Sequence, residues 1–232
     1  MPWSAPQRPA AYAEETLVNA ILDGVYPSGT TLPGERDLAA QLGVTRPTLR
    51  EVLGRLERDG WLTIQHGKST RVNDFWLEGG LNVLDALARR PDALPGDFIR
   101  RLLEVRLALA PAYACDAVRC GAADVAAYLA GAAGLADTAD AYAGFDWGLH
   151  HALTVASDNP VYTLILNGFA GLYRQMALVY FSQAEARVSS QTFYQELLGA
   201  IQQQCPTAAQ RIVERVMKES IVLWQEFREQ GV

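Results

Sequence analysis

The fold of the first third of the chain is decided by the stretch VTRPTLREVL, which spans residues 44–53. Thr45 is predicted to cap a helix, and Pro47 falls in the first turn, where the missing N–H of a proline does no harm. This helix is expected to run to about Asp59, because Gly60 then stops it. Its apolar side chains recur at helical spacing and are therefore predicted to face a core: Leu49, Val52, Leu53 and Leu56.

Two more helices are predicted before this stretch, and a β-hairpin after it. Residues 10–23 show helical apolar spacing, and residues 33–42 form a short second helix that Gly43 ends. The β-rich residues 61–64 can pair with residues 69–72 across a tip that contains a glycine. The predicted order of helix, helix, turn, helix and hairpin is that of a winged helix-turn-helix.

The start of the third helix carries side chains that suit DNA. Arg46 and Arg50 are four residues apart and therefore share one helix face. A forked guanidinium can bond guanine O6 and N7 or a phosphate, and the hydroxyls of Thr45 and Thr48 can bond phosphate. In a helix-turn-helix this helix enters the major groove, with its N-terminal residues at the base edges.

The positive charge of this region is local. The whole chain has a net charge of −6, but residues 36–71 hold seven Lys and Arg side chains against four Asp and Glu. His66, Gly67 and Lys68 fall at the predicted hairpin tip, from which side chains can enter a minor groove. The order of the elements and the basic tip favour DNA binding over the alternative, an ordinary solvated helix face.

From residue 77 onward every periodic segment is predicted to be helical. The fold class is therefore mainly α with a small β-hairpin wing: an N-terminal winged helix-turn-helix followed by a C-terminal all-α bundle. Membrane insertion is not expected, because Arg174 interrupts the most apolar segment. The expected helices span residues 77–89, 97–119, 122–139, 142–157, 160–181, 188–203 and 207–229.

The N-terminal motifs resemble those of the GntR family of bacterial regulators. The resemblance rests on PSGTTLPGERDLA at residues 27–39, the stretch at 44–53, DGWL at 59–62 and GKSTRV at 67–72. Pro47 departs from the threonine expected in close relatives. The resemblance implies the following DNA contacts: Arg36, Thr45, Arg46, Thr48, Arg50, His66, Gly67 and Lys68.

Patches along the whole chain are similar to the branch of this family that regulates fatty acid metabolism. Two of them are WLTIQHGK at residues 61–68 and NPVYTLILNG at residues 159–168. The resemblance implies a homodimer that binds a palindromic DNA operator and is released by a long-chain acyl-CoA effector, without a resident cofactor. It also implies repression of fatty-acid degradation genes and activation of unsaturated fatty-acid synthesis genes. The domains expected on this basis are a DNA-binding domain at residues 1–73, a linker with a short helix at 74–95, and an acyl-CoA-sensing domain at 96–232.

An acyl-CoA needs an apolar tunnel for its chain and polar groups for its head. Arg106 and Lys218 can neutralise phosphates. The resemblance assigns Ser220 and Trp224 to the effector-responsive segment, and it puts Met217 where close relatives have glycine, which leaves the preferred acyl length open. The predicted ligand-binding residues are Leu102, Arg106, Phe145, Asp146, His150, Tyr180, Lys218, Glu219, Ser220 and Trp224.

A metal site is not expected in the helical domain. Many relatives with such a domain use an Asp, a His four residues later and two further histidines. Asp146 and His150 have that spacing, but no histidine follows His151. The alternative function, a regulator of the same architecture that senses a small organic acid through a metal, is separated from the first by a metal assay.

An enzyme is not expected either. The sequence holds no phosphate-binding glycine loop, no nucleophile elbow and no zinc-protease motif. The three cysteines are few and odd in number, which favours a reducing cytoplasm over a disulfide framework.

Overall fold

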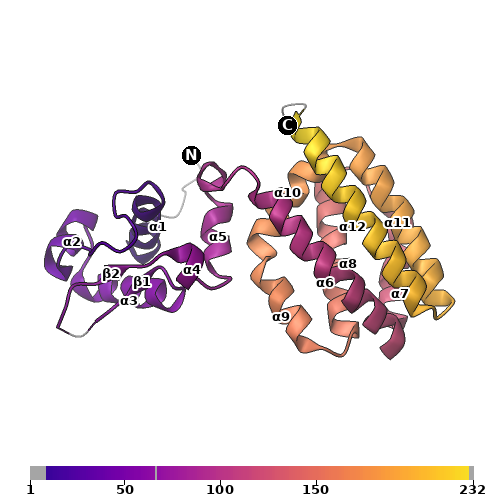
Figure 1. Ribbon diagram of the computed structural model, residues 1–232, viewed down its shortest axis with the longest axis horizontal. Coiled ribbons are helices and arrows are strands. Elements are labelled where there is room, and N and C mark those ends of the chain that lie inside the picture. Colours follow the sequence, from indigo (N-terminus) through magenta and orange to yellow (C-terminus); the bar gives the residue numbers. More distant parts are fainter. Residues whose placement is uncertain (1–8, 66, 230–232) are drawn as a thin grey trace, which may run out of the picture. The chain divides into compact units, whose positions relative to one another are not determined.

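The computed structural model describes residues 9–65 and 67–229. The chain divides into two compact units, of which the first ends at Leu94 and the second begins at Pro95 (Figure 1). Each unit has its own cluster of buried apolar side chains. Within the described residues, no helix combines the length and the apolar character that crossing a membrane requires.

The first unit consists of short helices and a two-stranded wing. The strands are antiparallel and pair Leu62 with Val72 and Thr63 with Arg71, while Thr31 forms an isolated bridge to Arg71. The predicted helix-turn-helix and hairpin are thereby confirmed. The elements are α1 (Pro9–Leu22), α2 (Glu35–Leu42), α3 (Arg46–Arg58), β1 (Leu62–Thr63), β2 (Arg71–Val72), α4 (Phe75–Glu78), α5 (Val83–Ala88) and the 3₁₀-helix η1 (Pro91–Ala93).

The turn between α2 and α3 forms as the sequence predicts. Gly43 takes a φ of 66°, a left-handed conformation that ends α2. Thr45 caps α3, because its side-chain oxygen accepts a hydrogen bond from the Thr48 N–H at 3.3 Å. The inward-facing residues of α3 are all at most 2% exposed, which confirms the prediction for Leu49, Val52, Leu53 and Leu56.

The segment predicted to be a linker packs on the core of the first unit. Its helix over residues 77–89 was predicted to be continuous, and this is wrong, since the pair Gly79 and Gly80 separates α4 from α5. Gly60 has a φ of 90°, and a Cβ on it would lie 2.5 Å from the carbonyl oxygen of Glu78, so only glycine permits this approach. The buried Leu87 of α5 joins the same core.

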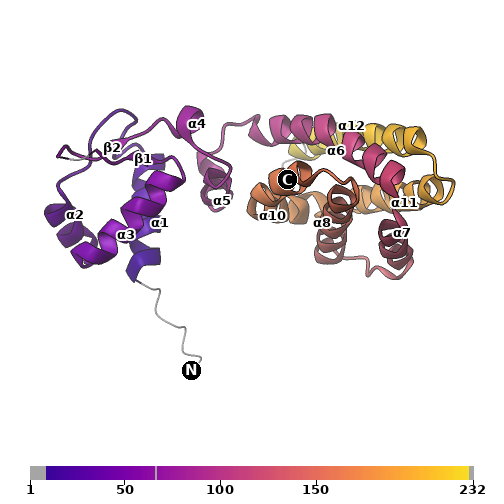
Figure 2. The ribbon, with the colours of Figure 1, turned by 90° about the horizontal axis from the view of Figure 1, so that it is seen from below.

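The second unit is an all-helical bundle. Helices α6 and α12 run antiparallel and side by side, and α11 lies next to α12 (Figures 1 and 2). The elements are α6 (Phe98–Cys120), α7 (Ala123–Ala130), the 3₁₀-helix η2 (Gly131–Gly134), α8 (Ala139–Ala156), α9 (Pro160–Gly168), α10 (Ala170–Ser182), α11 (Ala184–Gln202) and α12 (Pro206–Glu229).

Two predicted helices of this unit are shorter than expected. The helix predicted over residues 122–139 ends at Ala130 and gives way to η2, and Thr138 then caps α8 by accepting from the Ala141 N–H. The helix predicted over residues 160–181 is broken at Phe169, which follows Gly168 and serves both as C-cap of α9 and N-cap of α10. A glycine inside a helix lowers its stability, which is the physical reason for a break at that point.

Candidate DNA interface and ligand cavity

The recognition helix α3 presents the predicted DNA-binding side chains on its exposed face. Arg46 and Arg50 are 57% and 62% exposed, whereas the leucines on the other side of α3 are buried. The hydroxyls of Thr45 and Thr48 lie 2.9 Å apart at the start of the helix. The local fold therefore places four predicted contact residues together at one helix N-terminus.

A carboxylate that the sequence reading missed lies beside these arginines. Glu35, the first residue of α2, accepts a hydrogen bond from Arg50 Nε at 2.7 Å, and its Oε2 is 3.8 Å from Arg46 Nη2. The fold class gives one general hint, because α2 and α3 pack together in any helix-turn-helix. The spacing of 15 residues between Glu35 and Arg50 does not reveal the pair without that geometry.

Arg36, the predicted contact from α2, is 85% exposed, and among the described residues it pairs only with its neighbour Asp37, at 3.1 Å. Its side chain is therefore free to leave the protein surface for a phosphate.

The wing carries the other predicted contacts. Gly67 has a φ of 72°, and the Lys68 N–H donates to the carbonyl of Gln65 at 3.1 Å, which closes the turn at the tip. His66 was predicted to contact DNA, but it lies outside the described residues. Arg71, counted in the basic excess, forms a bidentate pair with Glu78 at 2.8 and 3.3 Å. The hydrogen bond with Arg71 lowers the pKa of the Glu78 carboxyl, which therefore stays ionised. Because Glu78 balances its charge, Arg71 is not a free cation.

The second unit contains an apolar cavity between helices α6, α9, α10 and α12. Its volume is about 90 Å³, and the wider empty space around it, which includes open solvent, is about 940 Å³. Most of its walls are aliphatic and aromatic side chains, such as Leu102, Phe169 and Met176. Six of the ten predicted ligand-binding residues line it: Leu102, Arg106, His150, Tyr180, Ser220 and Trp224.

Four predicted ligand-binding residues lie outside the cavity lining. Phe145 packs between the rings of Tyr128 and Tyr194, with ring centroids 4.7 and 4.9 Å away. Asp146 is behind the wall, in contact with Arg106.

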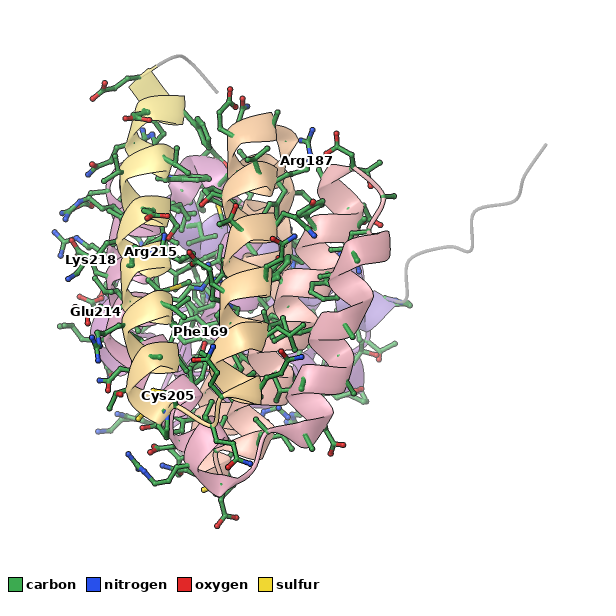
Figure 3. All side chains as sticks on the ribbon, turned by 90° about the vertical axis from the view of Figure 1, so that its right-hand side faces the viewer. Phe169, Arg187, Cys205, Glu214, Arg215 and Lys218 are labelled. Carbon is green, nitrogen blue, oxygen red and sulfur yellow. The ribbon has the colours of Figure 1, made fainter. Side chains whose placement is uncertain are left out.

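Lys218 and Glu219 line a separate charged groove between α11 and α12. Figure 3 shows Lys218 and Glu214 on the outward side of α12, where they form an ion pair at 2.6 Å. Ser220 and Trp224 face the cavity four residues apart, whereas Lys218 is about 200° around the helix from Ser220. Met217 is buried in the core of the bundle and is not among the lining residues.

A buried polar cluster forms part of the cavity wall. Arg106 Nη2 donates to Asp146 Oδ2 at 2.8 Å and to His150 Nε2 at 2.6 Å. Because a guanidinium can only donate, His150 carries its proton on Nδ1 and donates it to the Tyr113 hydroxyl oxygen at 2.6 Å. Tyr173 and Tyr194 donate to the two oxygens of Asp146. Every member except Asp146 and Tyr194 lines the cavity.

The ionisation states in this cluster follow from burial and from the arginine. Burial, followed by the nearby Arg106 charge, lowers the pKa of His150 to about 3, so the imidazole is neutral. Burial alone would raise the pKa of Asp146, but Arg106 and the other groups around the carboxylate together outweigh burial, and the pKa is lowered. Burial raises the pKa of Tyr113, which therefore keeps its proton. The cluster is one buried ion pair surrounded by neutral hydrogen-bonding groups.

Arg106 occupies the place between Asp146 and His150 that a metal ligated by both would need. The Asp146 and His150 side chains, whose closest atoms are 3.7 Å apart, are joined through the guanidinium. Among the described residues, no three His, Cys, Asp or Glu side chains gather into a metal-binding group. The residues present therefore do not fit the metal site of the alternative prediction.

Sequence reasoning missed Tyr113, Tyr162 and Met176 among the cavity residues. Tyr113 could have been found, since it lies seven residues after Arg106 and therefore on the same face of α6. The other two lie on α9 and α10, and their inclusion depends on how those helices pack.

The winged helix-turn-helix and the cavity-bearing helical unit together define a DNA-binding transcription regulator with a site for a small molecule. Residues 9–72 match the bacterial regulatory proteins of the gntR family, and residues 73–230 match the FadR C-terminal domain. The chain belongs to the GntR family and carries the FadR-type C-terminal domain.

Individual relatives agree with this assignment. The chain is 45% identical over 222 residues to the fatty acid metabolism regulator protein of Shewanella halifaxensis, covering 95% of this chain and 92% of that one. It is 49% identical over 190 residues to the protein of the same name from Shewanella amazonensis, covering 82% and 79%. It is thus a transcription regulator of the fatty acid metabolism type, and not an enzyme.

A solved structure of Lar, described as controlling expression of the Listeria monocytogenes agr system, is similar in fold. It has a TM-score of 0.64 at 14% identity, and the match covers 95% of this chain and 98% of that one. At this identity the likeness supports the fold alone.

Proposed function

We propose that this chain is a cytoplasmic, homodimeric transcription factor that a long-chain acyl-CoA releases from a palindromic operator. On the operator it represses genes of fatty-acid degradation and activates genes of unsaturated fatty-acid synthesis. The observation that carries the proposal is the apolar cavity of the FadR-type unit, whose wall includes a cation and several hydroxyl groups.

The apolar lining of the cavity suits a flexible apolar chain. Each buried CH₂ contributes about 0.8 kcal/mol, so a long acyl chain supplies on the order of 10 kcal/mol before ordering costs are subtracted. Helix α9, which is apolar along most of its length, has no fully buried residue, and its Tyr162, Ile165 and Leu166 line the cavity. An acyl chain would cover these half-exposed side chains.

Polar groups in the wall suit an oxygen-bearing ligand. The Trp224 indole Nε1 is buried without an acceptor among the described residues, and Trp224 lines the cavity. A buried N–H without a partner is rare and unfavourable, so a ligand oxygen in its reach would be stabilised. The Tyr113 hydroxyl oxygen accepts a hydrogen bond from His150, so the Tyr113 proton can be donated to a ligand oxygen in the cavity.

The DNA side of the proposal rests on the exposed residues of α2, α3 and the wing. In a symmetric dimer, two recognition helices must match half-sites about one turn of DNA apart, so a small change in their spacing weakens binding. A ligand that binds the DNA-free arrangement more tightly would therefore release the operator.

The test is fluorescence anisotropy of a labelled duplex recovered from a random pool by the full-length chain. Palmitoyl-CoA should dissociate the complex, whereas free CoA and acetyl-CoA at equal concentration should do so far less. A complex that ignores saturating palmitoyl-CoA would refute the acyl-CoA effector and leave the family assignment intact.

Trp224→Phe sharpens this test, because it keeps a ring and removes the unpartnered N–H. The palmitoyl-CoA concentration for half-release should rise about two- to tenfold, the worth of one hydrogen bond. Trp147→Phe is the matched control, since Trp147 is not among the lining residues and contacts the cavity wall only from behind, through Tyr173. An equal response in both variants would remove Trp224 Nε1 from the ligand site.

A further inference from the structure

Glu35 links two side chains that the proposed function assigns to DNA. One oxygen of its carboxylate accepts from Arg50 Nε at 2.7 Å and lies 3.8 Å from Arg46 Nη2. The Glu35 side chain is 36% exposed, less than either arginine. A single carboxylate on α2 therefore forms a hydrogen bond with Arg50 and a longer ion pair with Arg46, the two guanidinium groups of the recognition-helix face.

This geometry leaves the reading edge of Arg50 available. The carboxylate binds the guanidinium at Nε, so the two terminal nitrogens remain to form a bidentate pair with guanine O6 and N7. An arginine already held in one conformation loses less side-chain entropy when it binds. Glu35 thus orders Arg50 before DNA arrives.

The same contact reduces the attraction of the arginines for any phosphate. Two guanidinium groups beside one carboxylate carry a net charge of one instead of two. Attraction to the phosphate backbone depends on charge and carries no sequence information. A carboxylate here therefore opposes non-specific binding while it supports base reading.

We propose that Glu35 is a positioning residue for sequence discrimination, acting through Arg46 and Arg50. The inference rests on the proposed DNA contacts of these two arginines. Glu35 sets the ratio between affinity for the preferred sequence and affinity for any other DNA, and contacts no base itself.

Asp37 offers a matched control. Like Glu35, it is an acidic residue in the first turn of α2, so Glu35→Gln and Asp37→Asn each remove one negative charge from the same turn. Asp37 pairs with Arg36, its neighbour on the same helix, at 3.1 Å. Glu35→Gln removes a charge that pairs with Arg46 and Arg50 of α3, whereas Asp37→Asn removes a charge that does not.

The experiment measures two dissociation constants for the full-length chain at fixed salt. One duplex is recovered by the wild type from a random pool, and the other is a shuffled sequence of the same composition. Asp37→Asn should tighten binding to both duplexes by the same factor, which leaves the preference unchanged. Glu35→Gln should tighten binding to the shuffled duplex only, so the preference should fall by roughly fivefold or more.

An equal preference in Glu35→Gln and Asp37→Asn would overturn the inference. A wild type that prefers no sequence would instead refute the proposed DNA contacts, which is a different result. If Glu35→Gln does not fold, Glu35→Asp keeps the charge and withdraws the carboxylate by one methylene. This variant should lower the preference for the selected duplex without tightening binding to the shuffled duplex. A full wild-type preference in Glu35→Asp would also overturn the inference.

Discussion

The two units place their functional groups in opposite physical settings. In the first unit Arg46 and Arg50 are more than half exposed, and their partner Glu35 is also in contact with solvent. In the second unit Arg106 and Asp146 are 21% and 4% exposed, within a closed set of hydrogen bonds. Exposed ion pairs contribute little to stability, whereas removing one partner of a buried pair is strongly destabilising. Substitutions at the first site are therefore expected to leave the free energy of unfolding nearly unchanged, whereas substitutions at the second site are expected to lower it.

The largest expected effect concerns the protonation of His150. Its folded pKa of about 3 lies below the unfolded value of 6.5, so the unfolded chain binds more protons between these values. The stability contributed by neutral His150 is complete above about pH 6.5 and is lost as pH falls toward 3. The loss should reach about 4–5 kcal/mol at most.

Denaturant titrations at several pH values, which follow the unfolding of the second unit, measure this loss. His150→Gln should reduce the slope of stability against pH between 6.5 and 4, whereas His151→Gln serves as the control and should keep it. A slope unchanged by His150→Gln would show that this imidazole is not buried as a neutral group.

Replacing Asp146 should have the next largest effect. Asp146→Asn leaves the Arg106 charge without its counter-ion and should cost about 3–5 kcal/mol of unfolding free energy. Asp37→Asn, which breaks an exposed pair in the first unit, should cost less than about 1 kcal/mol. Calorimetry of both variants checks the contrast. Similar losses in the two would mean that burial does not distinguish the two sites.

The recognition-helix arginines should matter for DNA and little for folding. Arg46→Ala or Arg50→Ala should weaken binding to the selected duplex by roughly 1–3 kcal/mol and relax sequence preference. Arg119→Ala is a suitable control, because Arg119 is an exposed, ion-paired arginine of the second unit. The placement of α3 in the major groove would be wrong if both α3 variants bound the duplex as the wild type does.

The difference between the units also explains what the sequence could reveal. The helix-turn-helix and the face shared by Arg46 and Arg50 follow from local spacing, which is why they could be predicted without the structure. Glu35 escaped notice because its contact depends on how α2 packs on α3. The break at Phe169 was missed because apolar spacing continues through it.

The cavity could be predicted only in part, since several helices build it. Ser220 and Trp224, which the resemblance assigned to the effector-responsive segment, line the cavity. Lys218 was chosen for its charge, but its position on α12 points it the other way. Arg106 was predicted to neutralise phosphate, and the carboxylate of Asp146 already balances its charge.

The most direct test of the account is reciprocity between the two sites. If palmitoyl-CoA weakens DNA binding by a given factor, the DNA must weaken palmitoyl-CoA binding by the same factor. Calorimetric titration of palmitoyl-CoA into the free protein and into its complex with the selected duplex measures the second factor, and the anisotropy titration measures the first. The account predicts equal factors, both well above one. Palmitoyl-CoA that binds the free protein and the complex with the same affinity would contradict it.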